Sequence, residues 1–255
     1  MSRIVTIAAN TVREAIRDKV LGSIALFGGL LVVVSLAMRD LSIGDTDKAV
    51  QGLALSAMAF IGAVLAVFLG VGLVWKELER KTIYTLASKP MPRWHLLLGK
   101  YVGLWATLMV ELAALTAVYV AVTAPTLGMP GPASWIALAA LALELTFLCA
   151  WATLFSTFAA PASAAAYTVS VYVIGHFADD LQRFGQASRD PAFRETATTL
   201  YRLVPNLEMF NLRAEAVHGV LVPAGELASI AAYGLGGTLA VLSVAVLVFE
   251  RRDFS

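Results

Sequence analysis

Two glutamates stand inside long apolar stretches of this sequence, where a carboxyl group could hold a proton, an ion or a polar substrate. Glu111 lies near the middle of one stretch and Glu144 lies well inside the next. On insertion scales, Asp or a basic residue at the centre of a membrane helix costs about 2.5–3.5 kcal/mol, so such placements seldom lack a role. The glutamates either form a polar lining, a proton-linked site or a substrate contact, or they are protonated and hydrogen-bond a neighbouring helix. We favour the second interpretation, because neither has an obvious basic partner within a span.

A later apolar stretch carries hydroxyl groups that could also line a path. Tyr167, Ser170 and Tyr172 follow one another within six residues. Polar side chains of this kind equally make packing contacts between membrane helices, so the two interpretations remain open.

No catalytic, nucleotide-binding or metal-binding motif is recognisable. Gly99 and Lys100 are followed by Tyr101 and lack the earlier glycine of a phosphate-binding loop, so this chain is not expected to bind ATP or Mg. The single Cys149 leaves no disulfide or cysteine-based metal site within one chain. Metal-ligand spacing is also missing from the three histidines, which are His95, His176 and His218. We therefore expect neither enzyme activity nor a cofactor in this chain.

These side chains must be positioned by helices that cross a membrane. The chain is 59% hydrophobic and only 15% charged, whereas soluble domains carry about 25% charged residues. Several apolar stretches also exceed the ~18–20 residues that cross a hydrocarbon core. We predict an all-α polytopic membrane protein that forms one domain over residues 1–255. Its six spans are expected at about 20–38, 51–75, 98–122, 135–158, 162–178 and 227–249, of which the fifth is short and polar.

The N-terminal stretch 2–19 is too charged to span. Its apolar residues share one helical face, and Arg3, Arg13 and Arg17 lie on the other. The apolar face consists of Ile4, Ala8, Val12, Ala15 and Ile16. This pattern predicts a helix lying in the membrane interface, with a helix packed on a soluble partner as the alternative.

Lys and Arg near the ends of the spans predict the orientation, because cytoplasmic loops carry an excess of them. With six spans, one side holds Arg3, Arg13, Arg17, Lys19, Lys76, Arg80, Lys81, Lys89, Arg93, Lys100, Arg251 and Arg252. The other side holds Arg39, Lys48 and the 179–226 segment, where acidic residues outnumber the arginines. Both termini are therefore expected in the cytoplasm, and residues 179–226 outside it.

The connector 76–97 does not resemble a loose loop. It lacks helix breakers up to Leu86, and Pro90 and Pro92 then end the predicted helix. We expect a short cytosolic helix flush against the membrane, with a mixed-charge surface that could dock a soluble protein. The residues expected to make this contact are Glu77, Leu78, Glu79, Arg80, Lys81, Thr82, Ile83 and Tyr84. Alternatively, the connector is only a positive anchor that sets the topology.

The connector also carries a resemblance to a known family. The stretch KELERKTIYTLASKP at 76–90, followed by LLLGKYVGL, is similar to permease subunits of type-two ATP-binding-cassette exporters. The branch that includes the permease of the nitrous-oxide-reductase copper-maturation system looks closest. Three further stretches fit the same branch: ANTVREAIRDKVL, LVPNLEMFNLRAEAVHG and FERRDF. Many relatives have glycine immediately before the Thr82 position, where this chain has Lys81.

The resemblance implies a permease of the bacterial inner membrane that forms the substrate path as a homodimer or heterodimer. Separate cytosolic ATPase subunits would bind ATP and Mg and push on the connector, which the family uses as a coupling helix. Membrane lipids and a periplasmic protein are further expected partners, and nucleic acid is not. A membrane scaffold that transmits ATPase work to a periplasmic assembly, or a stand-alone secondary transporter, remains the alternative.

The 179–226 segment contains two candidate amphipathic helices, around 191–204 and 207–220, separated at Pro205 and Asn206. In the second, an apolar face is expected from Leu207, Phe210, Ala214 and Val217. The resemblance implies an external cap or re-entrant helices, and the fifth span is implied to lie near the dimer cleft.

Overall fold

The computed structural model describes residues 46–79 and 93–251, together with residues 6–9, 12, 22, 26, 27, 30, 33 and 34. Every regular element in this described part is helical. The elements are α3 (Thr46–Glu79), α5 (Arg93–Leu127), α6 (Pro132–Phe158), α7 (Pro161–His176), α8 (Ala178–Ala187), α9 (Pro191–Leu203), η2 (Glu208–Phe210), α10 (Arg213–His218) and α11 (Ala224–Arg251). The chain is therefore an all-α membrane protein, as its composition predicts.

Four of the described helices are long and apolar enough to cross a membrane. The candidate spans are Asp47–Val71, Trp94–Pro125, Pro132–Phe158 and Ala224–Arg251. Each contains most or all of one predicted span. A segment in lipid must satisfy its own backbone hydrogen bonds, so a long apolar stretch of sequence forms a helix of matching extent. The predicted first span 20–38 and the interfacial helix 2–19 lie largely outside the described residues. The total of six spans therefore stays a prediction.

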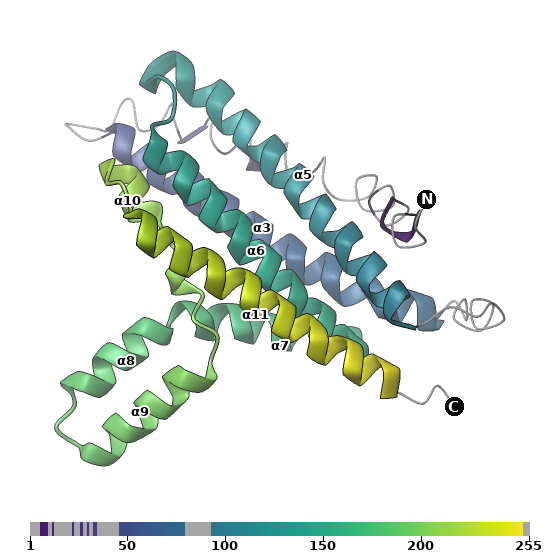
Figure 1. Ribbon diagram of the computed structural model, residues 1–255. Coiled ribbons are helices and arrows are strands. Elements are labelled where there is room, and N and C mark those ends of the chain that lie inside the picture. Colours follow the sequence, from purple (N-terminus) through teal and green to yellow (C-terminus); the bar gives the residue numbers. More distant parts are fainter. Residues whose placement is uncertain are drawn as a thin grey trace.

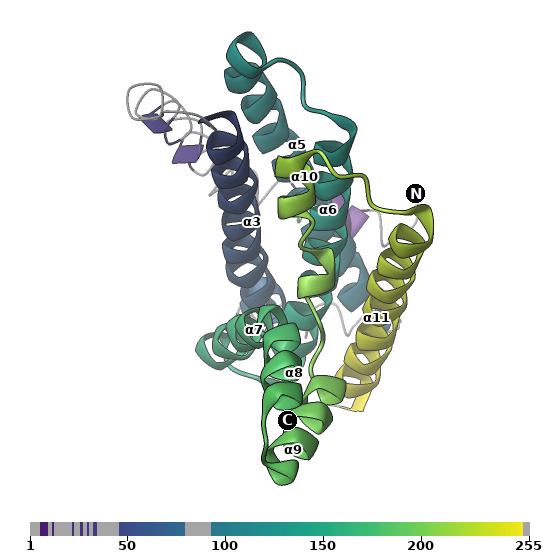
Figure 2. The same ribbon diagram turned by 90° about the vertical axis from the view of Figure 1, so that its left-hand side faces the viewer.

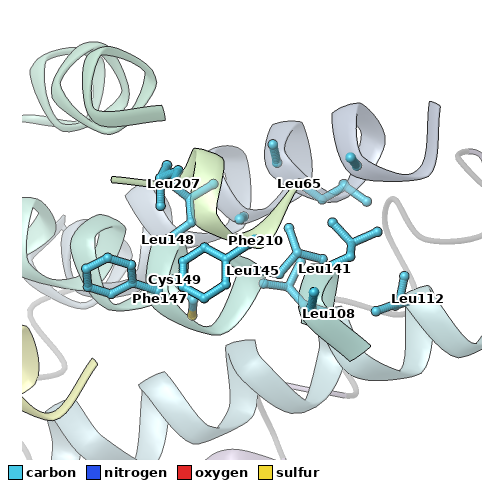
Figure 3. Close-up of a cluster of buried hydrophobic side chains, with 14 of the residues drawn as sticks. Leu65, Leu108, Leu112, Leu141, Leu145, Phe147, Leu148, Cys149, Leu207 and Phe210 are labelled. Carbon is cyan, nitrogen blue, oxygen red and sulfur yellow. The ribbon is translucent and has the colours of Figure 1, made fainter. Parts of the chain in front are cut away.

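Helix α6 is the centre of the bundle, since it packs against α3, α5 and α11. Figure 3 shows Leu145, Leu148 and Cys149 of α6 among buried side chains from neighbouring segments, and Leu148 is fully buried. Helices α3 and α6 approach closely at Gly70, where an added Cβ atom would lie 2.5 Å from the Cβ of Ala152. Small residues allow such close contact between membrane helices, and packing then replaces the hydrophobic effect as the driving force.

The predicted fifth span differs from one continuous crossing. Helix α7 has 16 residues and is therefore about 24 Å long, less than the ~30 Å of a hydrocarbon core. It begins at one end of the bundle, where Ala164 clusters with Val67 and Val71 of α3. It ends at His176, which faces Glu144 halfway along α6. The helix thus returns the chain through only half of the bundle.

The second half of the crossing is made by residues 207–218, after an excursion of the chain. The Leu207 amide donates to the carbonyl of Gly175 at 3.0 Å, so the chain resumes beside the point where α7 stops. Further on, the Ala216 carbonyl accepts a hydrogen bond from Gln51 near the start of α3. The Gln51 side chain also donates to Ser134 at the start of α6. Residues 207–218 therefore reach the end of the bundle opposite to the start of α7.

The excursion between the two halves is a helical hairpin, α8–α9, which projects away from the flank of the bundle (Figure 1 and Figure 2). Its two helices cross closely because Gly185 faces Ala197, whose Cβ atom lies 2.5 Å from the place of a Cβ at Gly185. At the base, the Asn206 side chain donates to Asp179 at 2.7 Å, and the Asn206 amide donates to the Tyr233 hydroxyl at 2.8 Å. These bonds fix the hairpin to α11.

The predicted amphipathic helix at 207–220 is instead the 3₁₀ turn η2 followed by the short α10. Leu207 and Phe210 are buried as expected, but Ala214 is exposed and Leu212 and Ala216 are buried in its place. The break at residues 211–212 explains the difference, because it shifts which side chains of α10 face the core.

Candidate functional site

Glu144 meets a basic partner at the break in the fifth crossing. The carboxyl group is only 2% exposed, and its Oε1 atom lies 3.5 Å from Nε2 of His176. The other ring nitrogen, Nδ1, lies 3.0 Å from the Tyr172 carbonyl oxygen. A carbonyl can only accept, so Nδ1 carries a proton and donates it. Nε2 and Oε1 would then present facing lone pairs unless a further proton lies on one of them.

The segment after the hairpin brings three more polar side chains to the same place. Arg213 donates through Nε to the side-chain oxygen of Asn211 at 2.6 Å. The Asn211 amide in turn donates to Glu208 at 2.7 Å. Glu144, Asn211 and Arg213 line one small cavity, of about 10 Å³, with apolar residues of α3 and α6 around it. We call Glu144, His176, Glu208, Asn211 and Arg213 the polar cluster.

The polar cluster is positioned by apolar anchors on either side of it. Leu207 is fully buried, and Phe210 is 2% exposed. The Phe210 ring packs against Phe147 of α6 and Tyr233 of α11, with centroids 6.4 and 6.0 Å apart. Figure 3 shows Leu207 and Phe210 among the core side chains of α6. Burial of these two residues holds Glu208, Asn211 and Arg213 at the level of Glu144.

The composition of the polar cluster decides what it can do. The polar cluster combines two carboxyl groups with one guanidinium and one imidazole, so a proton held by Glu144 or His176 would reduce its net negative charge. The cavity has room for about one water molecule. Among the described residues, no group of three or more His, Cys, Asp or Glu could hold a metal ion. The geometry therefore suits a structural ion pair or a proton site, and not a large substrate pocket.

The other residues predicted to line a path do not lie together, because some are buried and others are exposed. Glu111 is 1% exposed within α5. Tyr167 is 47% exposed, and the exposed Ser170 donates to the Ala166 carbonyl of its own helix. Of these residues, Tyr172 lies beside the polar cluster, since its ring centroid is 4.6 Å from that of His176. The structure thus separates Tyr172 from Tyr167 and Ser170, which occupy the exposed side of α7.

Four members of the polar cluster were not predicted as site residues, namely His176, Glu208, Asn211 and Arg213. The sequence does contain a signal for the last three of these residues. In the stretch PNLEMFNLR, polar residues are dense and are interspersed with the apolar Leu207 and Phe210, which are buried in the structure. The basic partner of Glu144 lies 32 residues away in the chain and outside its span, so periodicity within a span could not reveal it.

The predicted coupling residues are only partly described. The backbone of residues 77–79 forms the end of α3, which is continuous with its membrane span, and does not begin a separate helix. Residues 80–84 lie outside the described part. Figure 1 shows the C-terminal ends of α3 and α11 at the same end of the bundle as the start of α5. The connector is therefore tied to that end by two long helices.

The chain matches the family model of the ABC-2 family transporter protein over residues 5–254. It belongs to the ABC-2 transporter family. The match covers nearly the whole chain, so the broken crossing and the polar cluster lie within the ABC-2 permease domain. The family places this chain as a multi-pass membrane permease component of an ABC transporter, which works with ATPase subunits. No curated protein matches the chain.

In this ABC-2 permease, Glu144→Gln is expected to retain assembly and most ATP-dependent activity, as is Glu111→Gln. The glutamine amide at position 144 can donate to Nε2 of His176, which lies 3.5 Å from Oε1 of Glu144. Glu144→Leu removes every polar atom of this side chain from beside Nε2, and an unsatisfied buried polar group costs about 1–3 kcal/mol. Melting temperature and ATP turnover of the purified transporter measure both effects. An assembled but inactive Gln variant would show that the carboxyl group itself lines the path.

Proposed function

We propose that this chain is the permease subunit of an ATP-driven exporter of the bacterial inner membrane, with both termini in the cytoplasm. Two permeases would form the substrate path and work with two cytosolic ATPases. The observation that carries the proposal is the family match over residues 5–254. The resemblance of 76–104 and 203–219 to the copper-maturation branch supports the export direction and a periplasmic partner.

In this proposal the connector 76–97 couples ATP hydrolysis to the path. ATP binding closes the ATPase pair and displaces the connector, which lies between the ends of α3 and α5. Both helices are more than 30 residues long and pack together with α6 into one body, so a displacement at their ends is transmitted along the bundle. Close packing makes such transmission effective, because packed interiors deform little.

Disrupting the connector should detach the ATPase without unfolding the membrane part. The proposed test is the variant Glu79→Arg/Arg80→Glu/Tyr84→Ala, co-expressed with its ATPase and purified in detergent. Loss of a buried aromatic anchor commonly costs more than about 1 kcal/mol, and reversed charges slow association. We expect ATPase recovery and ATP turnover to fall several-fold, while the permease elutes as in the wild type.

The matched control is Glu226→Arg, an exposed charge at the opposite end of α11, which should leave ATPase recovery unchanged. Wild-type recovery and turnover in the triple variant would mean that the connector is only a topological anchor. A scaffold without transport is separated from an exporter by measuring ATP-dependent solute movement in sealed vesicles.

A further inference from the structure

The two halves of the fifth crossing meet at a tight junction. The Leu207 amide donates to the Gly175 carbonyl at 3.0 Å. A Cβ atom at Gly175 would lie 2.7 Å from Cγ of Leu207 and 2.9 Å from the Pro205 carbonyl oxygen, so glycine is needed for this close approach. Directly after Gly175, the end of α7 places His176 against Glu144 of α6. The contact between His176 and Glu144 therefore also fixes the junction against α6.

Two buried polar atoms face each other across this contact. Oε1 of Glu144 and Nε2 of His176 lie 3.5 Å apart, and neither atom has a hydrogen-bond partner in the described part of the chain. The other ring nitrogen, Nδ1, is already engaged, because it donates to the Tyr172 carbonyl. Without a further proton, Nε2 and Oε1 are two acceptors that face each other away from water, which is unfavourable. One added proton makes one of them a donor and joins α7 to α6.

The charges around this contact favour one proton and not two. Arg213 lines the same cavity as Glu144, so a second proton would place an imidazolium near a guanidinium. With one proton, the two carboxyl groups and the guanidinium of the polar cluster together carry no net charge, which a buried site favours. Helix α3 adds only apolar residues to the cavity wall, Leu55 and Ala59. The other elements packed against α6 contribute these titratable groups to the bundle: Tyr172 of α7, Glu208 of η2, Glu215 of α10, Tyr101, Glu111 and Tyr119 of α5, and Tyr233 of α11.

We infer that Glu144 and His176 bind one proton between them, and that this proton holds the junction of the fifth crossing on α6. Loss of the proton sets a carboxylate against the lone pair of a neutral imidazole, so the end of α7 is no longer tied to α6. Residues 207–218, which are hydrogen-bonded to α7 at Gly175, then lose part of their anchorage. The proton site belongs to the chain itself, so it does not depend on the direction of transport.

A bound proton at this site predicts a defined dependence on pH. In an unfolded chain, glutamate and histidine have both lost their protons above about pH 6.5. The native pair still holds one proton there, so the native state binds more protons than the unfolded state and its stability falls as the pH rises. We expect the loss to be local at first, because residues 207–218 can separate from α6 before the whole bundle unfolds.

The test is hydrogen–deuterium exchange, measured by mass spectrometry from neutral to alkaline pH on the full transporter with its ATPase in lipid nanodiscs. Each exchange rate is divided by the chemical exchange rate at that pH. In the wild type, the corrected exchange of residues 205–212 should rise several-fold, while residues 145–155 of α6 stay protected. In Glu144→Gln the amide donates to Nε2 without a titrating proton, so protection should not depend on pH. The matched control is His218→Gln, at the end of α10, which should respond as the wild type does.

Two outcomes would overturn the proton site: wild-type exchange in residues 205–212 that does not change with pH, or a wild-type response that persists in Glu144→Gln. His176→Gln is the second variant, in case Glu144→Gln does not assemble. Its amide donates to the Glu144 carboxylate, so a pH response that persists in this variant would equally reject the site. ATPase recovery in the same samples tests the proposed function separately, because loss of the ATPase from the wild-type permease would reject the transporter assignment and leave the proton site intact.

Discussion

Replacing Gly70 with leucine is expected to prevent the membrane bundle from forming, and Gly70→Ala is expected to destabilise it. An added Cβ would lie 2.5 Å from the Cβ of Ala152, an atom on the short side chain of a facing helix that cannot rotate away. Overpacking of this kind costs about 1–3 kcal/mol for a small group. Helix propensity alone would predict the opposite result, because alanine in a helix is favoured over glycine by about 1 kcal/mol.

The measurement is the melting temperature of the detergent-purified permease, together with its recovery as a monodisperse species. Gly70→Ala should lower the melting temperature by several degrees. The matched control is Gly236→Ala in α11, an exposed glycine with no atom within 4 Å of the added Cβ, which should not lose stability. The double variant Gly70→Ala/Ala152→Gly should recover most of the loss. An unchanged melting temperature for Gly70→Ala would contradict the close contact of α3 and α6.

Removal of the Arg213 guanidinium should have the second large effect. Arg213→Met removes the cation that lines the same cavity as Glu144. It also removes the donor to Asn211, whose amide in turn donates to Glu208. A hydrogen bond made by a charged group contributes about 1.5–3 kcal/mol to stability. Because Arg213 and Glu208 are only partly buried, we expect a loss of about 2 kcal/mol, which corresponds to roughly 4–8 °C in melting temperature.

The control is Arg183→Met in α8. This arginine is 79% exposed and lies 3.8 Å from Asp180 on the same helix, an exposed pair that contributes at most about 1 kcal/mol. The double variant Glu144→Gln/Arg213→Met should lose less stability than the sum of the two single variants, because the two residues are coupled. Additive losses would show that Glu144 and Arg213 act independently, and the polar cluster would then not be one unit.

The polar cluster also changes the interpretation of the buried glutamates. From the sequence, Glu111 and Glu144 are equivalent, because each is a lone carboxyl in an apolar stretch. The structure gives Glu144 an imidazole at 3.5 Å and an arginine in the same cavity. A protonated carboxyl that bonds to a neighbouring helix is consistent with this geometry. The neighbour is contributed by the end of α7, with further polar groups from the segment after the hairpin.

The sequence by itself determined the fold class and the location of most spanning helices. Lipid offers no hydrogen-bond partners, so a long apolar stretch is stable there only as a helix. The length of that helix then follows directly from the length of the apolar stretch in the sequence. This holds for α3, α5, α6 and α11, each of which contains most or all of a predicted span. The motifs around the connector and at 203–219 also pointed to the family that the chain matches over residues 5–254.

The tertiary structure alone decided how the fifth crossing is built and which residues meet there. The composition of residues 161–218 is compatible with one tilted span followed by an outer cap. Instead, the buried Leu207 and Phe210 return the chain to the core of α6. Their burial places Arg213 beside Glu144, although 69 positions separate them in the chain. Contacts over such separations depend on which apolar side chains fill the space between helices, and this information is not contained in the periodicity of any single segment.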